Sequence, residues 1–211
     1  VNLLGSSAWA QARVQEFYVA LPETQIRQHF LQLASGTGTT FESVVSITVG
    51  NNGTRVVYDH WEDGYEVDLN NPVQSTTQIW GDGNNANGIP PGYVNDPVGL
   101  PAGAVIALRN LVNLPRNASQ VLYDGRDRLG ASNAIVVSRA SWATNPGSVL
   151  ADAVELLSTV DWGTSYVAPV GEDVIFPTPL ASSMFEKVAM FVQAAENGTQ
   201  VQIDKNADGV T

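Results

Sequence analysis

The residues best spaced to do chemistry are three oxygen-bearing side chains near the end of the sequence, Asp204, Asn206 and Asp208, followed by Gly209. Calcium takes about six to eight oxygen ligands, and calcium loops carry them at alternate positions with a glycine at the sharp turn. The spacing therefore predicts a calcium-stabilised loop. The alternative is a solvated turn, because turns prefer the same residue types.

A second acidic stretch, YDHWEDGYEVD, covers residues 58–68. Asp59 and Asp63 make it a weaker calcium candidate, because Trp61 replaces the ligand at the intermediate position. The stretch also permits a hydrolase hypothesis, with His60 as a base or metal ligand and two carboxylates as an acid and base pair. Neighbouring side chains on a strand point to opposite faces, so this hypothesis ranks last.

Aromatic side chains beside carboxylates and amides form a third candidate site. Rings stack on sugar faces while polar groups bind the hydroxyls, which suggests a platform for a glycan. The stronger alternative places the large rings in the core or under loops, where aromatic side chains bury most area. The ligand-binding candidates are Trp61, Tyr65, Trp80, Asp82 and Tyr93.

The composition excludes several classes of partner. The 211 residues include 21 acidic and 10 basic side chains, a formal net charge of -11, and no basic stretch suited to phosphates, so nucleic acid is not an expected partner. The absence of cysteine excludes a disulfide framework. No apolar run approaches roughly 18 residues, so no membrane span is predicted. Candidate glycosylation sequons occur at Asn52, Asn117 and Asn197.

One phrase occurs twice, over residues 41–64 and 185–209. Each copy has two runs of alternating apolar residues around an Asn-Gly turn, at Asn52 and Asn197, and closes in an acidic loop. Two such runs joined by Asn-Gly predict a β-hairpin. The repeat therefore indicates a structural unit more than an active site.

Short β-type runs bounded by glycine and proline predict an all-β fold, an antiparallel β-sandwich. An arrangement in two sandwich-like halves, residues 13–115 and 116–211, is the alternative, the second half lacking its final strand. Residues 23–35 fit a helix or a strand, and residues 81–103 predict a long functional loop. The runs cover residues 16–21, 45–49, 56–58, 104–108, 120–123, 134–138, 154–157 and 165–170.

Residues 1–12 are largely apolar and contain small-residue cleavage patterns. They predict the remnant of a signal peptide, and hence a secreted, extracellular or cell-surface location. The alternatives are an ordinary strand and an apolar arm that pairs with a neighbouring copy of the chain.

Four phrases carry a likeness to a known family: EFYVALPE (16–23), ASNAIVVSRASW (131–142), VELLSTVDWGTSYVAPV (154–170) and VAMFVQAAENGTQVQID (188–204). With them the chain resembles the N-terminal domain of IgGFc-binding proteins and related large bacterial surface proteins. The resemblance implies an extracellular, non-enzymatic, β-rich module for binding or adhesion. IgG binding is not carried over, because no residue motif for it can be matched.

Three functional hypotheses follow. The first is a calcium-stabilised adhesion or binding module whose loops contact a glycan, a surface protein or another copy of the chain. The second is a structural subunit of an extracellular filament or sheath, assembled by strand exchange through residues 1–12. The third is a hydrolase that uses the acidic residues between Asp59 and Asp68.

Overall fold

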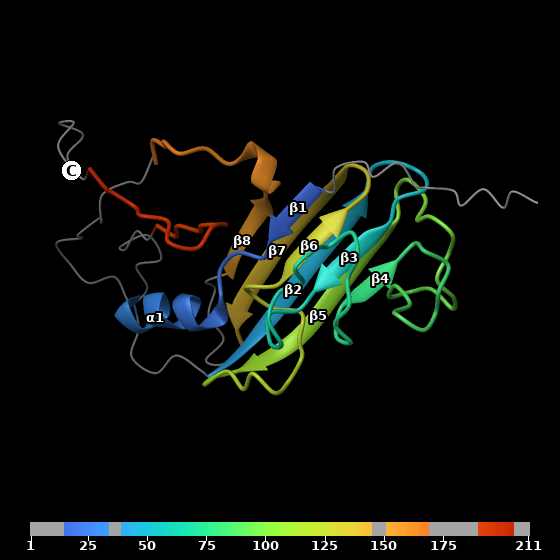
Figure 1. Cartoon of the computed structure of the whole chain (residues 1–211). Helices are drawn as coiled ribbons and strands as arrows, with labels where there is room; N and C mark the ends of the chain where they lie inside the picture. Colours follow the sequence, from blue (N-terminus) through green and yellow to red (C-terminus); the bar gives the residue numbers. More distant parts are fainter. Residues whose placement is uncertain (1–14, 34–38, 145–150, 169–189, 205–211) are drawn as a thin grey trace, which may run out of the picture.

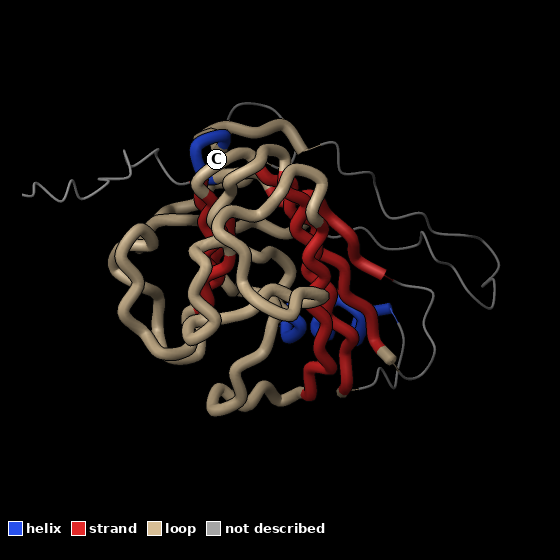
Figure 2. The backbone as a smooth tube through the Cα atoms, turned by 90° about the vertical axis from the view of Figure 1, so that its right-hand side faces the viewer, coloured by secondary structure: helices blue, strands red, loops and turns tan. Residues whose placement is uncertain are grey.

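The structure, a computed structural model, describes residues 15–33, 39–144, 151–168 and 190–204. Two four-stranded antiparallel sheets face each other (Figure 1), and they form two layers in the perpendicular view (Figure 2). The predicted all-β antiparallel fold is confirmed.

Sheet A has the order β1 (Gln15–Tyr18), β6 (Arg128–Ala131), β3 (Val56–Asp59) and β4 (Gln78–Trp80). Sheet B has the order β5 (Val105–Asn113), β2 (Thr40–Val49), β7 (Ile135–Ala143) and β8 (Ala151–Leu156). Most predicted runs lie within or overlap these strands. The run at 120–123 is a loop, and the described residues of the run at 165–170 form no strand.

The ambiguous stretch after β1 is a helix, α1 (Glu23–Leu33). Glu23 in its first turn suits the positive end of the helix dipole. Ile26 is buried in a cluster with Leu21, Phe41 and Leu114, which attaches the helix to one end of the sandwich. A short 3-10 helix, η1 (Thr159–Asp161), follows β8.

The main core lies between the two sheets. On β2 the alternation predicted from the sequence turns Val45, Ile47 and Val49 inward, where they belong to one cluster with Tyr58 and Trp80 of sheet A. Fully burying a side chain of this kind contributes roughly 1.5–3 kcal/mol. The core thereby fixes the two sheets, and the connections that leave them, in one arrangement.

The hairpin predicted for the first repeat is wrong. β2 pairs with β5 on one edge and with β7 on the other, whereas β3 pairs with β4 and β6. Asn52 and Gly53 do form a turn, with Gly53 at φ 75°. That turn carries the chain from sheet B across to sheet A, because both edges of β2 are already occupied.

The second copy of the repeat is described only in part. Residues 190–204 include a turn at Asn197 and Gly198 and no strand, so the hairpin prediction also fails there. The remaining residues of this copy, and residues 1–12 with their predicted signal or arm role, lie outside the described residues.

Each sheet contains strands from both sides of residue 115. β1 pairs with β6, and β2 pairs with β7. The described strands therefore form one sandwich, and the boundary predicted between residues 115 and 116 does not divide them into two units. Neither helix of the described part is long and apolar enough to span a membrane.

Candidate functional site

Two long connections, one between two strands of sheet A and one that leads from sheet B into sheet A, meet and are joined by hydrogen bonds. They are the β3–β4 connection, residues 60–77, and the β5–β6 connection, residues 114–127. The Leu122 N–H donates to Glu62 Oε1 at 3.0 Å, and Trp61 Nε1–H donates to Asp124 Oδ1 at 2.9 Å. β3 and β6 pair with Asp59 opposite Arg128, so the two connections leave the sheet side by side. We call the place where they meet the junction.

His60 lies at the centre of the junction and is only 1% exposed. Its ring packs against the rings of Tyr58 and Tyr123, with centroids 5.1 and 5.2 Å away. Its Nδ1 lies 3.1 Å from the Leu122 carbonyl oxygen and 3.6 Å from Asp127 Oδ2. A carbonyl oxygen only accepts hydrogen bonds, so Nδ1 carries a proton and donates it.

Asp127 is a fully buried carboxylate that several donors share. Tyr58 Oη donates to its Oδ2 at 2.8 Å, and the Asp124 N–H donates to the same oxygen at 3.0 Å. Burial raises the pKa of Asp127 to about 6, although the hydrogen bond and charge of His60 oppose this. Burial lowers the pKa of His60, but Asp127, the Leu122 carbonyl and the charge of Glu62 together outweigh burial, so the net pKa is raised.

Glu62 completes this cluster. Its Oε1 pairs with Arg116 Nη2, while its Oε2 is buried and has no hydrogen-bond partner among the described residues. Burial raises the pKa of Glu62, and the charge of Asp127 raises it further. Within the described chain, the group with the geometry to hold a metal is His60, Glu62 and Asp127, with one ligand-type atom of each within 4.8 Å of the others.

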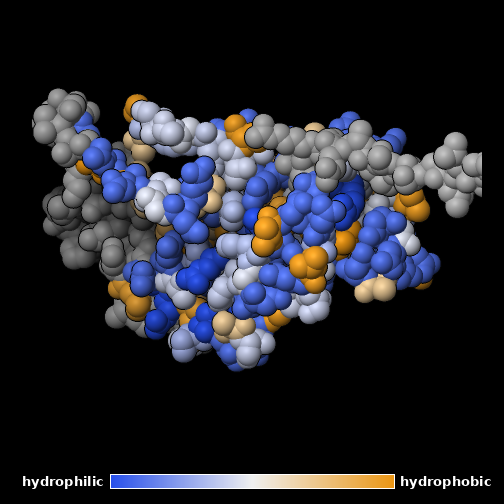
Figure 3. Space-filling model, viewed as in Figure 1, coloured by the Kyte–Doolittle hydropathy of each residue, from blue (hydrophilic) through white to orange (hydrophobic). Residues whose placement is uncertain are grey.

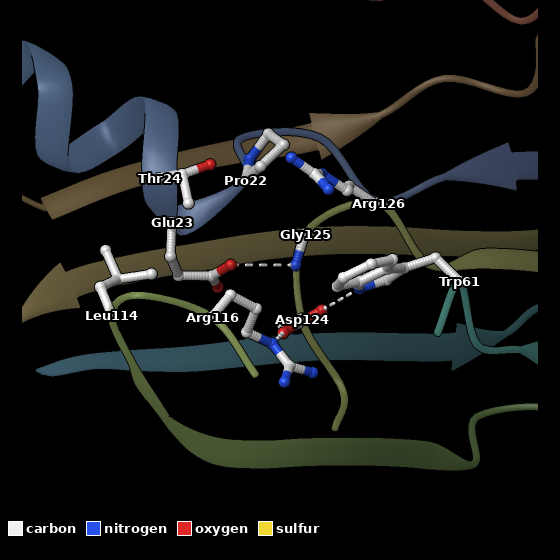
Figure 4. A pocket seen from close by; sticks show the side chains of 9 residues that line it. All are labelled: Pro22, Glu23, Thr24, Trp61, Leu114, Arg116, Asp124, Gly125 and Arg126. Carbon is white, nitrogen blue, oxygen red and sulfur yellow. Dashed lines mark hydrogen bonds and ion pairs between the residues drawn. The ribbon is translucent and has the colours of Figure 1, made fainter. Parts of the chain in front are cut away.

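Trp61 borders a small pocket beside the cluster (Figure 4). The guanidinium groups of Arg116 and Arg126 lie over its ring, 5.5 and 5.0 Å from the centroid, and Arg116 Nε pairs with Asp124 Oδ2 at 2.6 Å. The cavity volume is ≈ 20 Å³. That is room for about one water molecule, so a sugar ring does not fit.

Asp59 and Asp63 do not form a joint cation site. Asp59 is fully buried, and its Oδ2 lies 2.8 Å from Arg128 Nη2. Asp63 is exposed and accepts a hydrogen bond from Thr76 Oγ1 at 2.7 Å. The two carboxylates face different partners, because β3 ends at Asp59 and the chain then turns.

The calcium loop at the end of the sequence stays a prediction. Asp204 is described and partly exposed. Asn206 and Asp208 lie outside the described residues.

The structure does not assemble the predicted glycan platform. Trp80 is 0% exposed in the core, and Tyr93 is half-buried against that core, so both candidates are corrected to packing residues. Asp82 is engaged in its own loop, where it accepts hydrogen bonds from the Asn84 N–H at 2.9 Å and Asn87 Nδ2 at 2.7 Å.

Tyr65 is the most exposed of the predicted aromatic ligands, at 41%. Its ring makes an edge contact with Tyr18, with centroids 5.7 Å apart, and its Oη donates to the Arg126 carbonyl at 2.6 Å. Tyr65 therefore helps to join the β3–β4 connection to β1 and to Arg126. With Trp61 under two arginines, these rings form no open sugar-binding face.

The three sequon asparagines are exposed. Asn52 Oδ1 accepts a hydrogen bond from the Ala102 N–H at 2.8 Å, and Asn117 Oδ1 accepts one from the Ser119 N–H at 3.0 Å. Glycosylation at Asn52, Asn117 and Asn197 stays a prediction.

Glu66 holds the β3–β4 connection in place. Its buried Oε1 accepts hydrogen bonds from the Val73 N–H at 2.8 Å, the Gln74 N–H at 2.7 Å and Thr77 Oγ1 at 2.9 Å. Burial raises the pKa of Glu66, but the hydrogen bonds lower it by more, so the net pKa is below the usual range. This carboxylate therefore has a structural role in its loop.

Asp96 has the same role in the β4–β5 connection, residues 81–104. Its carboxylate is buried and accepts hydrogen bonds from the N–H groups of Gly81, Asp82 and Gly83, at 2.7, 2.9 and 2.7 Å. Asp96 thus anchors the first residues of the long loop that was predicted from its Gly, Pro and Asn content.

Sequence reasoning missed the half of the site that residues 114–127 supply, namely Arg116, Asp124 and Asp127. One signal was present, since YDGRDR at residues 123–128 parallels YDHWED at residues 58–63 in its Tyr-Asp start and its later acidic residues. Comparisons with protein families, with curated proteins and with solved structures found no match to this chain.

Proposed function

We propose that this chain is a non-catalytic binding module of a secreted or cell-surface protein, and that its partner is another surface protein. One observation carries the proposal. Buried carboxylates hold the long loops in place, and the tips of these loops present aliphatic side chains to solvent. Loops on a β-sandwich commonly supply the contacts to a partner.

The anchoring of the loops supports binding more than catalysis. Glu66 and Asp96 each accept three hydrogen bonds from their own loops, and Asp59 is paired with Arg128. An acid and base pair needs carboxylates that can reach a substrate. Most carboxylates of the acidic stretch instead hold the backbone, and the adjoining pocket admits about one water molecule.

The loop tips carry the exposed apolar surface. Val67 and Val73 of the β3–β4 connection are 103% and 88% exposed, and Val94 and Val98 of the β4–β5 connection are similarly exposed. Figure 3 shows hydrophobic residues in orange on an otherwise hydrophilic face. Aliphatic tips on anchored loops lose little conformational entropy on binding, and they suit a protein surface better than a sugar.

The test uses an immobilised mucin glycoprotein, with and without enzymatic removal of its glycans, as the surface-protein probe. We expect the full chain to bind both forms, and the double variant Val67→Ser with Val73→Ser to bind at least about tenfold more weakly. The matched control is Val105→Ser, whose side chain is 58% exposed on β5 of the other sheet. Equal affinity of the loop variant and the control contradicts the proposed surface, and binding only to the glycosylated form contradicts the protein partner.

A second candidate function, self-assembly, is favoured by the edge of sheet B. β5 is a nine-residue edge strand, and within the described chain its outer edge pairs with no strand. Long edge strands are templates for pairing with another chain. Light scattering should then show assemblies that Leu111→Lys on β5 reduces and that Val136→Lys on the internal strand β7 leaves unchanged.

A further inference from the structure

We propose that His60, Glu62 and Asp127 form a site for one divalent transition-metal ion of the zinc type. The site is independent of the proposed binding surface, because it lies under the loops rather than at their tips. It would tie the β3–β4 connection to the β5–β6 connection through a common ion.

The ligand set selects the class of metal. One imidazole and two carboxylates suit zinc and its neighbours, whereas calcium prefers oxygen ligands alone. One ligand-type atom of each of the three residues lies within 4.8 Å of those of the other two. Zinc–ligand bonds of about 2.0–2.1 Å in tetrahedral geometry place two ligand atoms of one ion roughly 3.3 Å apart, so shifts of up to about 1.5 Å would bring the three atoms to that spacing.

Two unpartnered buried atoms point independently to a ligand. His60 Nε2 and Glu62 Oε2 are both buried, and neither has a hydrogen-bond partner within the part of the chain that the structure describes. His60 Nδ1 donates to the Leu122 carbonyl, which leaves the lone pair of the neutral ring on Nε2. A backbone carbonyl on the second ring nitrogen is the usual support of a metal-binding histidine.

The local charge also favours a divalent cation. Three buried carboxylates, Glu62, Asp124 and Asp127, meet one buried guanidinium, that of Arg116. Arg116 pairs with Oε1 of Glu62 and with Asp124, which leaves Oε2 of Glu62 available. Tyr58 Oη donates to Asp127 and would orient that ligand. Two negative charges then remain without a positive partner among these four groups, and one divalent cation would neutralise them.

The test is calorimetric titration of the metal-free full chain with zinc chloride. We expect binding of about one equivalent, weakened at least about tenfold in His60→Gln and in Glu62→Gln. The chain has two histidines and no cysteine, so His29→Gln is the matched control for nitrogen ligands. Asp63→Asn controls for exposed acidic groups, and both controls should bind like the wild type.

An NMR titration of the wild-type protein with zinc tests the proposal even if the His60 or Glu62 variant does not fold. With only two histidines, the imidazole signals in an NMR spectrum can be assigned from the His29→Gln spectrum. We expect zinc to shift the His60 signals and to leave those of His29 in place. Zinc that shifts only His29, shifts neither, or binds equally to a folded His60→Gln variant overturns the proposal.

Discussion

Glu66 and Asp127 are both buried carboxylates next to sheet A, yet their pKa values move in opposite directions. Both lose solvation on folding. For Glu66, three hydrogen bonds to its own loop outweigh burial, and the pKa is lowered. For Asp127, burial prevails and the nearby charge of Asp124 adds to it, so the pKa rises to about 6.

The difference teaches how to separate a structural carboxylate from one that is available to a cation. Glu66 faces backbone donors and the positive charge of Arg128, so its ionised form is satisfied. Asp127 shares its site with Glu62 and Asp124, and like charges at close range favour uptake of a proton or a metal. A buried carboxylate thus anchors the β3–β4 connection at Glu66, whereas the buried carboxylates around Asp127 are available to a cation.

The largest expected effect is that of removing the anchor. Glu66→Ala leaves the N–H groups of Val73 and Gln74 without their acceptor, so we expect a loss of about 3 kcal/mol in the free energy of unfolding. Urea denaturation measures it. Glu66→Gln keeps an amide oxygen in place and should cost only about 1 kcal/mol. Equal and small losses in both variants would show that the loop does not depend on this side chain.

The pH dependence of the unfolding free energy tests the role given to ionised Glu66. The folded pKa of Glu66 is lowered from its ordinary value of 4.5, so the stabilisation that the ionised side chain provides is complete above that pH and is lost as the pH falls through the folded pKa. The stability gap between wild type and Glu66→Gln should therefore narrow on acidification below 4.5. Urea midpoints measured in a pH series test this, and a gap that stays constant or widens contradicts the assignment.

Replacing Asp127 should cost less than removing the Glu66 anchor. Asp127→Asn keeps an oxygen that accepts from Tyr58 Oη and removes a buried charge, so the metal-free protein should lose no more than about 1 kcal/mol at neutral pH. Thermal unfolding in the presence of a chelator provides the measurement. A loss as large as that of Glu66→Ala would mean that Asp127 is a structural anchor as well.

The smallest effect belongs to Asp63, the exposed carboxylate of the same acidic stretch. Asp63→Asn should change the unfolding free energy by less than about 0.5 kcal/mol, because the hydroxyl of its partner Thr76 can still donate to the amide oxygen. Denaturation under the same conditions supplies the comparison. A larger loss would place Asp63 among the anchors.

The sequence predicted which face of an individual strand is buried, but not which strands pair with it. The alternation of Val45, Ile47 and Val49 was enough to predict the buried face of β2. The Asn52-Gly53 turn was also predicted, yet it joins two sheets, since turn residues do not specify which strands pair. β6, with the sequence Arg-Leu-Gly-Ala, was missed because it lacks β-branched residues.

The sequence indicated only part of the candidate site, because it does not specify which strands pair. His60 and Glu62 stand together in an acidic phrase, but Asp127 reaches them only through the pairing of β3 with β6. Tyr58 and Asp127, which share a hydrogen bond, are 69 positions apart. Local spacing does not encode that contact, whereas the register of two strands does.

The central claim, that buried carboxylates fix the loops which present the binding surface, is tested most directly by amide hydrogen exchange. We expect the amides of Val73 and Gln74 in the wild-type chain to exchange as slowly as those of the central strand β2, because both are bonded to Glu66. Exchange of these two amides at the rate of an unstructured peptide would contradict the claim.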